Sequence, residues 1–460
     1  MRIPPEKIDE IRLSSDIVTV ISGFVALKKR GKNFLGLCPF HQEKTPSFTV
    51  SAEKQMYHCF GCGKGGNVFT FLMETEKISF IEAVRTLAEK AGIVLPQYQP
   101  DGGEDGEKPN LQEELYNICR AAAVHFRENM FDTVEGKMAL EYFKHRGFSE
   151  ETIKKFGLGY SMNGWDTFVQ YMKSQEVPME RLEQAGLARK RDDGSNYDYF
   201  RGRAMFPIFS RTGRVVGFGA RKIREDDAVS GKYINSPETP VYSKSRILYG
   251  LFQSKEEIRE KEYAVLVEGY ADLISMYQAG IKNVVASSGT ALTKDQIKLV
   301  RDYAKKIVIT YDADSAGSKA ALRGVDLIIE EGLEVRVVEL PEGHDPDTFV
   351  REKGAKAFQE LIDNSISFID YVANTFEQAG KLETPEGQAE TVRALVQIIA
   401  KINDELKRDF YIKQIAEKYK LTEPTLYREL KKYLPQSGAQ AYRQGARVLP
   451  DSQIVPVVNH

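Results

Sequence analysis

The chain has 460 residues, which is enough for about three domains of roughly 150 residues each. Hydrophobic residues make up 42% and charged residues 28%, and 24 Phe and 22 Tyr can fill several cores. This composition excludes disordered, collagen-like and mucin-like chains. The 64 basic and 66 acidic residues give a net charge of -2. A uniformly basic nucleic-acid coat protein is therefore excluded, and any nucleic-acid binding needs a local basic patch.

The four cysteines are too few for a disulfide scaffold, and three of them (Cys38, Cys59 and Cys62) are close in sequence. The N-terminal residues lack the apolar stretch of a signal peptide, and no run approaches the ~18 apolar residues that span a membrane. We therefore expect a cytoplasmic protein that does not contact membranes, in which clustered cysteines bind a metal. Cys119 lies in an apolar helical stripe and is expected in a core.

The first half of the chain divides at an acidic stretch rich in Gly and Pro, residues 97–110, which is typical of a flexible linker. It separates a small module, residues 1–96, from the rest. Residues 111–148 show apolar residues three and four apart, which predicts helices that include His125 and His145 as ordinary residues. Residues 201–224 contain short apolar stretches broken by Gly and Pro, which predicts strands and turns.

The second half alternates from Tyr263 onward. The apolar runs AVLV, NVVAS, IVITY and VRVVEL are separated by helical patterns, which predicts βαβ units with a parallel sheet. From about residue 351 the pattern is helical to Tyr433, and residues 435–460 are expected to be a linker or disordered tail. The expected units are 1–96, 97–110, 111–258, 259–350, 351–434 and 435–460.

The small module contains two pairs of candidate metal ligands with two residues inside each pair: Cys38 with His41, and Cys59 with Cys62. Two tight turns of this kind can complete a tetrahedral Cys₃His site, which suits one structural Zn²⁺. Residues 47–50 and 55–58 are expected to be the strands of a zinc ribbon. His58 is an alternative ligand, but Cys59 completes the pair with Cys62.

Basic and aromatic residues lie beside these ligands in the sequence. Single-stranded nucleic acid could stack on the aromatic rings while the basic side chains bind phosphates. The alternative is that the aromatic residues fill the module's core. The residues are Lys28, Lys29, Arg30, Lys32 and Lys64, with Phe34, Tyr57 and Phe60.

Acidic residues follow three of the predicted parallel strands. Parallel strands end at one edge of a sheet, so Glu268, Asp312 and Asp314 are expected to converge there. Asp272, Asp345 and Asp347 are expected nearby. Carboxylates gathered in one crevice repel each other unless cations neutralise them, and hard oxygen ligands select Mg²⁺ or Mn²⁺. Two or more such ions suit phosphoryl or nucleotidyl transfer.

A basic stretch precedes the predicted parallel sheet. Between Arg189 and Arg224 there are ten basic and three acidic residues, although the whole chain is slightly acidic. This segregation fits a phosphate backbone or a triphosphate, and the alternative is a solvated basic face. Lys232, Asn235, Tyr242 and Lys244 add hydrogen-bond donors after it. Trp165, the single tryptophan, is expected to pack locally.

The chain resembles the bacterial DNA primases. The resemblance rests on motifs in the family's order from about Arg2 to Tyr433: CPFH, CFGC, YFKHRGF, YFRGRAMFPI, GFGAR, KYINSPETPVYSK, LVEGYAD, SSGTAL and YDADSAG. It implies a multidomain α/β and α+β protein with a zinc ribbon, a mixed α+β basic subdomain, a Toprim parallel sheet flanked by helices, and a helical subdomain.

The implied activity is DNA-templated synthesis of short RNA primers on single-stranded DNA at replication forks, by metal-dependent nucleotidyl transfer. The implied partners are ribonucleoside triphosphates, the DNA template, the RNA–DNA hybrid product and a replicative helicase, and we expect a monomer. The resemblance matches Glu268, Asp312 and Asp314 to catalytic Mg²⁺-binding acids, and Cys38, His41, Cys59 and Cys62 to zinc ligands. It matches a further set to template and nucleotide binding: Arg146, Arg201, Arg203, Arg221, Lys232, Asn235 and Lys244.

Family members usually continue for about another domain, the helicase-binding domain, after the segment that residues 435–460 resemble. We therefore expect that domain to be absent from these 460 residues, which leaves direct contact with the helicase open.

Proteins with other functions contain some of the same sequence features. A Toprim site also occurs in topoisomerases and some nucleases, although nothing marks one of the 22 Tyr as strand-cleaving. A primase fused to a helicase would need a G-x-x-x-x-G-K-[ST] motif, and this sequence has none. Residues 411–428 have the spacing of a helix-turn-helix, which would suit a non-enzymatic DNA-binding regulator. The alternative for that segment is a helical hairpin that closes the core.

Overall fold

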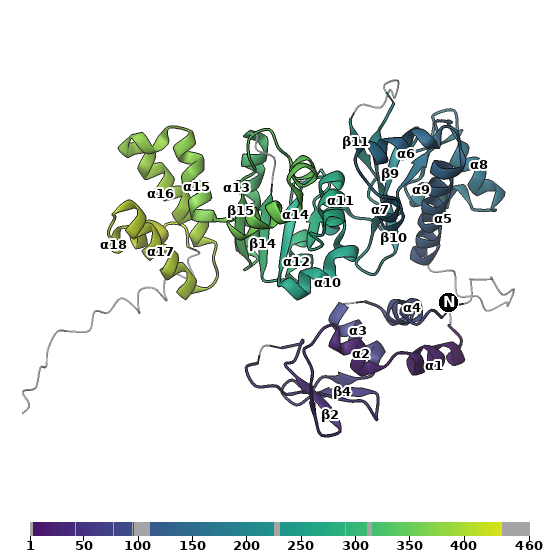
Figure 1. The fold of residues 1–460 in the computed structure, drawn as a ribbon, viewed down its shortest axis with the longest axis horizontal. Coiled ribbons are helices and arrows are strands. Elements are labelled where there is room, and N and C mark those ends of the chain that lie inside the picture. The colour runs from purple at the N-terminus through teal and green to yellow at the C-terminus, as the bar shows by residue number, and fades with distance from the viewer. Residues whose placement is uncertain are drawn as a thin grey trace, which may run out of the picture.

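The computed structural model describes residues 3–41, 43–76, 78–93, 95, 111–224, 231–289, 291–310 and 315–434, without the side chains of 5 and 315–321. The described residues form four units in chain order (Figure 1). The predicted linker, the predicted tail, Asp312 and Asp314 lie outside the described residues.

The N-terminal unit is an antiparallel sheet with helices packed on it. Its strands follow the order β1-β2-β3-β4-β5, and the predicted zinc ribbon is confirmed. Phe48 and Tyr57 stack in its core with ring centroids 5.3 Å apart, and Phe71 meets Tyr57 edge-on. The elements are α1 (Pro5–Ser14), α2 (Ile17–Ser22), β1 (Lys28–Arg30), β2 (Asn33–Gly36), β3 (Phe48–Ser51), β4 (Met56–Cys59), β5 (Gly65–Gly66), α3 (Val68–Glu76) and α4 (Phe80–Lys90).

The second unit surrounds an antiparallel sheet of order β11-β10-β9-β6, with a separate hairpin of β7 and β8. Strands β9 and β10 lie where the sequence predicts strands between residues 201 and 224. Cys119 is buried among helix and sheet residues, as predicted. The elements are α5 (Leu111–Asp132), α6 (Gly136–His145), α7 (Glu150–Phe156), β6 (Gly159–Ser161), α8 (Thr167–Ser174), α9 (Met179–Gln184), β7 (Ala188–Lys190), β8 (Asn196–Asp198), β9 (Arg203–Phe209), β10 (Val215–Lys222), β11 (Tyr233–Asn235) and the 3₁₀ helix η1 (Lys244–Arg246).

The third unit is the predicted parallel sheet, with strand order β13-β12-β14-β15-β16. Its four parallel strands are the four apolar runs, and the short antiparallel edge strand β16 was not predicted. The elements are α10 (Leu251–Lys261), β12 (Tyr263–Val267), α11 (Tyr270–Ala279), β13 (Val284–Ala286), α12 (Lys294–Arg301), β14 (Lys306–Thr310), α13 (Ser315–Glu330), β15 (Glu334–Val338), α14 (Pro346–Asp363) and β16 (Ile366–Ser367).

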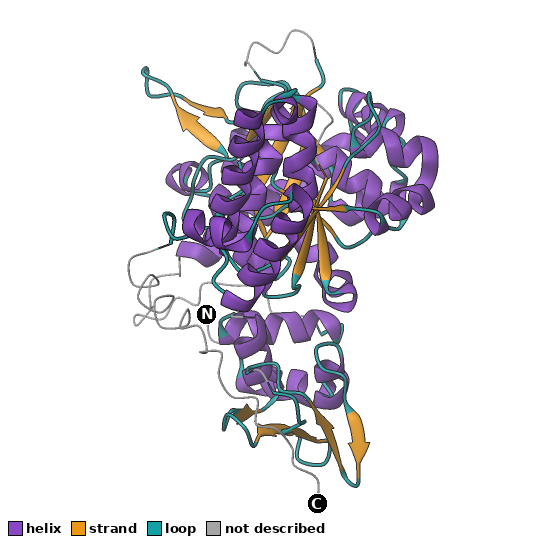
Figure 2. Cartoon of the chain, turned by 90° about the vertical axis from the view of Figure 1, so that its left-hand side faces the viewer, coloured by secondary structure: helices purple, strands orange, loops and turns teal. Residues whose placement is uncertain are grey.

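Helices cover both faces of this sheet because alternate residues of its strands point to opposite sides (Figure 2). Leu266 and Ile309 face a core shared with α10, α12 and α13. Val265 and Val308 face a second core shared with α11, α14 and the antiparallel sheet. The runs are apolar throughout for this reason, which is the pattern of strands buried on both faces.

The fourth unit is helical and shares a core with the sheet. Ile412, Ile415, Leu426 and Leu430 belong to the same buried cluster as Leu266. These contacts support the helical hairpin that closes the core. The elements are α15 (Phe368–Gln378), the 3₁₀ helix η2 (Lys381–Glu383), α16 (Pro385–Ala400), α17 (Glu405–Tyr419) and α18 (Glu423–Leu430). Within the described part of the chain, no helix is long and apolar enough to cross a membrane.

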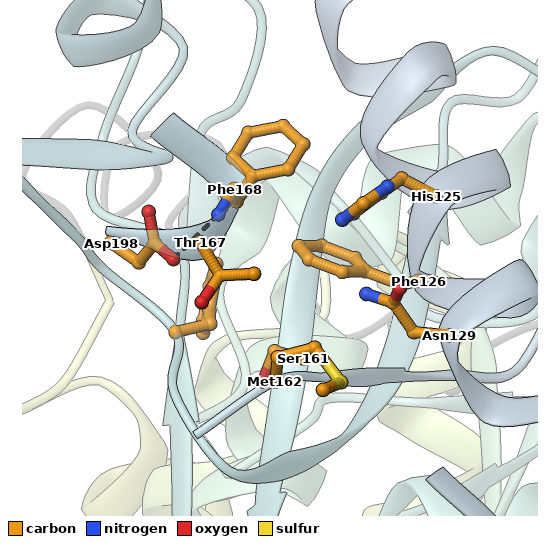
Figure 3. Close-up of a pocket in the computed structure, with 9 residues that line it drawn as sticks. His125, Phe126, Asn129, Ser161, Met162, Thr167, Phe168 and Asp198 are labelled. Carbon is orange, nitrogen blue, oxygen red and sulfur yellow. Dashed lines mark hydrogen bonds between the residues drawn. The ribbon is translucent and has the colours of Figure 1, made fainter. Parts of the chain in front are cut away.

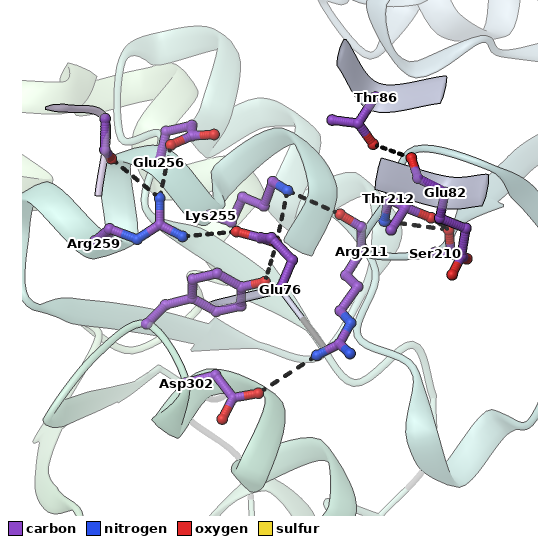
Figure 4. A network of polar contacts seen from close by, with 12 residues as sticks. Glu76, Glu82, Thr86, Ser210, Arg211, Thr212, Lys255, Glu256, Arg259 and Asp302 are labelled. Atoms are coloured by element: carbon purple, nitrogen blue, oxygen red, sulfur yellow. Dashed lines mark hydrogen bonds and ion pairs between the residues drawn. The ribbon is translucent and has the colours of Figure 1, made fainter. Parts of the chain in front are cut away.

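The zinc ribbon unit is held against the parallel-sheet unit by a buried ion-pair network around Glu76 (Figure 4). Glu76 ends α3, is 4% exposed, and lies 3.1 Å from Lys255 Nζ and 3.0 Å from an Arg259 nitrogen. The Tyr303 hydroxyl donates to the same carboxylate at 2.9 Å. The Arg259 guanidinium also covers the ring of Phe24, 4.2 Å from its centroid. Residues far apart in sequence are therefore joined across two units.

This contact lies at the amino edge of the parallel sheet. Helix α10, which carries Lys255 and Arg259, leads into β12, and Tyr303 precedes β14. The carboxyl edge, where Glu268 follows β12, is at the other end of the strands. The docked zinc ribbon and the predicted catalytic edge are thus separated by the length of the strands.

Glu76→Gln should weaken this docking. Removing one partner of a buried ion pair leaves the other charges uncompensated, so we expect a loss of about 3 kcal/mol. Hydrogen exchange at the amides of α3 and α10 measures it, with the exposed Glu89→Gln on α4 as a matched control. Equal protection in both variants would contradict the role of Glu76.

The same contact should depend on pH only in acid. Burial opposes ionisation of Glu76, but Lys255 and Arg259 outweigh it and hold its pKa below the usual range. A carboxylate with a lowered pKa stabilises the folded state above its unfolded pKa of about 4.3, and this contribution is lost as the pH falls toward the folded value. Protection of α3 that already declined between pH 7 and pH 6 would contradict this assignment.

Candidate functional site

The predicted zinc ligands converge in the structure. One ligand atom from each of Cys38, His41, Cys59 and Cys62 lies within 4.8 Å of the other three. The sulfurs of Cys38 and Cys62 are 3.8 Å apart, and Cys59 Sγ is 3.8 Å from His41 Nδ1. Two thiolates bound to tetrahedral Zn²⁺ at about 2.3 Å have sulfurs about 3.8 Å apart, so the donor set fits zinc. His58, the alternative ligand, points elsewhere and lies against Phe60.

Glu43 orients this site, a role that the sequence analysis missed. Its carboxylate accepts hydrogen bonds from the backbone N–H of Cys38 at 2.8 Å and of Ser47 at 3.0 Å. It also lies 3.3 Å from His41 Nε2, which leaves Nδ1 to face the cysteines. A carboxylate behind a ligating histidine fixes the tautomer and orientation of the ring. Gly61 is required beside it, because a Cβ there would lie 2.6 Å from His41 Nε2.

The two buried thiols have opposite pKa shifts. Burial raises the pKa of Cys38 to about 12. Burial also opposes ionisation of Cys59, but a hydrogen bond with the Ser47 hydroxyl and one from the Cys62 N–H outweigh it and lower the pKa to about 6. A divalent cation stabilises thiolates, so metal binding would ionise Cys38 as well.

The aromatic residues beside the zinc ligands divide between core and surface. Tyr57, for which base stacking and a core position were both open, is 2% exposed and belongs to the core. Phe60 is 75% exposed, and Lys28, Lys29 and Arg30 on β1 are all exposed. Lys64 is paired with Glu74 at 2.5 Å. The alternating burial of β4 explains the difference, because Tyr57 and Cys59 share its inner face.

The predicted catalytic edge is the carboxyl edge of the parallel sheet, where β12, β13 and β14 end. Glu268 directly follows β12 and is half-buried. Asp272 lies in the first turn of α11, where its carboxylate accepts a hydrogen bond from the Gly269 N–H at 3.0 Å. The register pairs Leu266 with Ile309, so β12 and β14 end together. Asp312 and Asp314 follow β14 in the sequence and are not among the described residues.

The two later acids occupy different surroundings. Asp345 caps helix α14, accepting a hydrogen bond from the Thr348 N–H at 2.7 Å. Asp347 is fully buried, with one oxygen 2.6 Å from Arg146 and the other accepting a hydrogen bond from the Ser275 hydroxyl. Both oxygens of Asp347 are thus engaged by protein groups, and its role as a metal ligand stays a prediction.

The predicted basic residues also separate by environment. Arg203 is 1% exposed, and its guanidinium donates to the carbonyls of Ala220 and Gly231. These contacts tie Arg203 to the antiparallel sheet, and its role in binding nucleotide or DNA stays a prediction. Arg146 is paired with Asp347, and Lys244 is half-buried in η1. Lys232 is exposed at the start of β11.

Arg221 and Asn235 lie in an aromatic seam beside the catalytic edge. The Arg221 guanidinium covers Tyr142 at 4.9 Å and Tyr233 at 5.4 Å from the ring centroids. The Asn235 side chain donates to the Ser288 carbonyl at 3.3 Å and accepts from the Tyr270 hydroxyl at 2.6 Å.

Trp165 forms an exposed platform that the sequence did not predict. It packs locally, as expected, but is 60% exposed, and the guanidinium carbons of Arg191 and Arg201 lie 4.2 Å and 4.4 Å from its ring centroid. Tyr197 contacts it edge-on. An aromatic face flanked by guanidinium groups can stack a base and bind its phosphates. The basic stretch was the available signal, but no sequence spacing connects residue 165 to residues 191–201.

Buried groups hold this platform in place (Figure 3). The Asp198 N–H donates to the Trp165 carbonyl at 2.7 Å, and the Asp198 carboxylate accepts from the N–H groups of Phe168 and Val169. Burial raises the pKa of Asp198 to about 6. The pocket drawn around Asp198 has no room for a water molecule, so it is packing beneath the platform and not a ligand site.

The zinc ribbon, the acidic edge of a parallel sheet and the basic antiparallel sheet together define an RNA polymerase of the nucleotidyltransferase type. Four family models match the chain: a CHC2 zinc finger (residues 3–102), a DNA primase catalytic core, N-terminal domain (125–255), a Toprim-like domain (265–350), and a DnaB-helicase binding domain of primase (369–423).

Curated relatives agree with these matches. The chain is 39% identical to a DNA primase of Halalkalibacterium halodurans over 99% of this chain and 77% of the relative. It is 42% identical to a DNA primase of Clostridium acetobutylicum over 95% of this chain and 71% of the relative. The chain belongs to the bacterial DNA primase family.

Solved structures share the fold. The zinc-binding and RNA polymerase domains of the Aquifex aeolicus primase match with a TM-score of 0.63 and 37% identity, over 91% of this chain and 98% of that one. A primase catalytic domain bound to single-stranded DNA matches with a TM-score of 0.62 and 30% identity, over 68% of this chain and 99% of that one.

The helicase-binding match changes one expectation. No such domain was expected in these residues, yet the matched segment covers nearly all of α15 and the whole of η2, α16 and α17. These helices share their core with the parallel sheet. The segment was assigned only as a helical subdomain because apolar periodicity reports burial and carries no information about a partner.

Cys59→Ser should lower the zinc content, because it removes one of four ligands. His58→Ala is the matched control and should retain one zinc per chain. Glu43→Gln should keep the ligands but weaken zinc affinity by about 10- to 100-fold, as expected for a group that orients a ligating histidine. Competition with a chelator, followed by metal analysis, measures all three. Unchanged zinc in Cys59→Ser, or zinc loss in His58→Ala, would overturn this ligand set.

Proposed function

We propose that the chain synthesises short RNA primers on single-stranded DNA at replication forks, by metal-dependent transfer of ribonucleotides. The observation that carries the proposal is the position of Glu268, at the carboxyl end of β12 and directly beside the seam of the basic sheet. Acidic groups on one side and basic groups on the other suit a nucleoside triphosphate with its divalent ions.

The reaction needs a 3′-hydroxyl to attack an α-phosphate while pyrophosphate leaves. Glu268, Asp312 and Asp314 would hold Mg²⁺ or Mn²⁺, which supplies stabilisation of the attacking and leaving oxygens when bound. Asp272 lies in the first turn of α11, and Asp345 caps α14. Both carboxylates would contribute to the site by keeping it hydrated. Lys232 and Lys244 would hold the triphosphate as point charges. Arg146 would act mainly by fixing Asp347 and the Tyr142 ring.

The template would reach this edge over the platform of Trp165, Arg191 and Arg201. The exposed ring and the two guanidinium groups support this path, and the related catalytic domain solved with single-stranded DNA supports DNA binding by this kind of domain. Stacking and phosphate contacts are tolerant of sequence, which suits an enzyme that copies many templates.

A replicative helicase is the proposed protein partner, through residues 369–423. The family-model match supports this contact. Leu406 and Phe410 are one turn apart on α17 and 65% and 67% exposed, so they offer an apolar contact. Replacing both with Ser should weaken binding to a ring-shaped replicative helicase in a pull-down, while primer synthesis without helicase is unchanged. Equal binding would contradict this location.

The acids should be essential for synthesis. We expect Glu268→Gln and Asp312→Asn to reduce primer synthesis to background while the thermal midpoint stays within a few degrees of the parent protein. The assay contains single-stranded DNA, labelled ribonucleotides and Mg²⁺ without a primer, and products are resolved on a denaturing gel. Short products destroyed by RNase support the proposal. Relaxation or cleavage of supercoiled DNA without such products would instead indicate a topoisomerase or nuclease.

Trp165→Ala should weaken template binding by about 1 to 3 kcal/mol, the contribution of one stacked base. Trp165→Phe should recover part of this affinity because it retains an aromatic face. Fluorescence anisotropy with labelled single-stranded DNA at fixed salt measures both. The platform is contradicted if the alanine variant binds as tightly as the parent protein.

A further inference from the structure

Tyr270 inserts its ring from the catalytic edge into the basic sheet. It is the first residue of α11, two positions after Glu268, and is 2% exposed. Its ring stacks on Phe206 of β9 at 5.2 Å and meets Tyr249 edge-on at 4.6 Å. Gly219 of β10 makes room for it, because a Cβ at that position would lie 2.4 Å from Tyr270 Cζ. The ring position is therefore fixed from several sides.

The Tyr270 hydroxyl begins a short chain of hydrogen bonds that returns to Glu268. It donates to Asn235 Oδ1 at 2.6 Å, and Asn235 Nδ2 donates to the Ser288 carbonyl at 3.3 Å. The Ser288 N–H donates to the Glu268 carbonyl at 2.9 Å. Ser288 has φ 59°, a left-handed conformation that non-glycine residues rarely adopt. These hydrogen bonds connect β11, the start of α11 and the ends of β12 and β13.

Both polar ends of the Asn235 side chain are engaged in this chain. An amide whose oxygen and nitrogen each have a protein partner is better suited to holding two segments together than to binding a nucleotide. Asn235 ends β11, and the exposed Lys232 precedes that strand. The amide thus connects the strand beside a proposed triphosphate ligand to the backbone of a proposed metal ligand.

We propose that Tyr270 and Asn235 are positioning residues that set the separation between the carboxylate of Glu268 and Lys232, which directly precedes β11. The inference rests on the proposed function, since it concerns the same site. Fixing both groups before substrate binds places the α-phosphate relative to the ion without reorganisation during the reaction. Neither residue contacts the reacting atoms in this role.

Tyr270→Phe isolates the hydroxyl, because the ring and its packing remain. We expect kcat for primer synthesis to fall by about 10- to 100-fold, the effect of a small misplacement of reacting groups. The thermal midpoint and the affinity for single-stranded DNA should match the parent protein. Asn235→Ala should cause a similar fall, and the double variant should be no slower than Asn235→Ala alone, since both changes break the same connection.

Tyr249→Phe is the matched control. Tyr249 is 1% exposed and touches Tyr270, but its hydroxyl has no hydrogen-bond partner among the described residues. Its removal should leave kcat unchanged.

The outcomes separate this inference from the proposed function. A parent protein that makes no primers contradicts the proposed function itself. A parent protein that makes primers, with Tyr270→Phe as fast as Tyr249→Phe, contradicts only the positioning pair. A slow Tyr270→Phe whose thermal midpoint and DNA affinity also fall contradicts it too, because the hydroxyl then acts on overall folding.

Discussion

Parallel strands of one sheet end at the same edge, and in this chain acidic residues follow several of those ends. Glu268 and Asp272 follow β12, and the register of β12 with β14 makes the two strands end together. Gathering carboxylates in this way is unfavourable unless positive charge is supplied. Arg146 supplies it for Asp347 in a buried ion pair. For the acids that face the edge, divalent cations and the basic groups of the neighbouring sheet are the available sources.

That requirement explains why the antiparallel sheet packs where it does. Its strand β10 places the Arg221 guanidinium over the Tyr142 ring, and its core is continuous with the α11 and α14 face of the parallel sheet. The seam between the two sheets is aromatic, with Phe206, Tyr249 and Tyr270 in contact. Aromatic rings keep water out of the seam while their hydroxyl groups remain available for directed hydrogen bonds.

The zinc ribbon depends on a different interaction. A module of under 100 residues has a small core, and its four zinc ligands connect segments that its short strands alone would hold weakly. Glu76 then fixes this module to the amino edge of the parallel sheet. The docking contact of the module and Glu268 are therefore at opposite ends of the same strands in this arrangement.

Local pattern made much of this architecture predictable. The apolar runs identified the parallel strands because strands covered on both faces lack polar positions, and the Cys and His spacing identified the metal site because tight turns bring such pairs together. Pattern could not separate Arg203 from Arg201, since Arg203 begins β9 whereas Arg201 precedes that strand, and burial depends on what covers each side chain. Nor could it find Trp165, Glu43 or Tyr270, whose roles arise from contacts between segments distant in sequence.

The central claim is that the carboxyl edge of the parallel sheet holds the catalytic ions. Crystals of the chain soaked in Mn²⁺, measured at the manganese absorption edge, test it directly, and the zinc signal at Cys38, His41, Cys59 and Cys62 provides an internal reference. The account predicts anomalous density within coordination distance of the Glu268 carboxylate. Full zinc density without manganese at Glu268, or manganese bound only elsewhere, would contradict it.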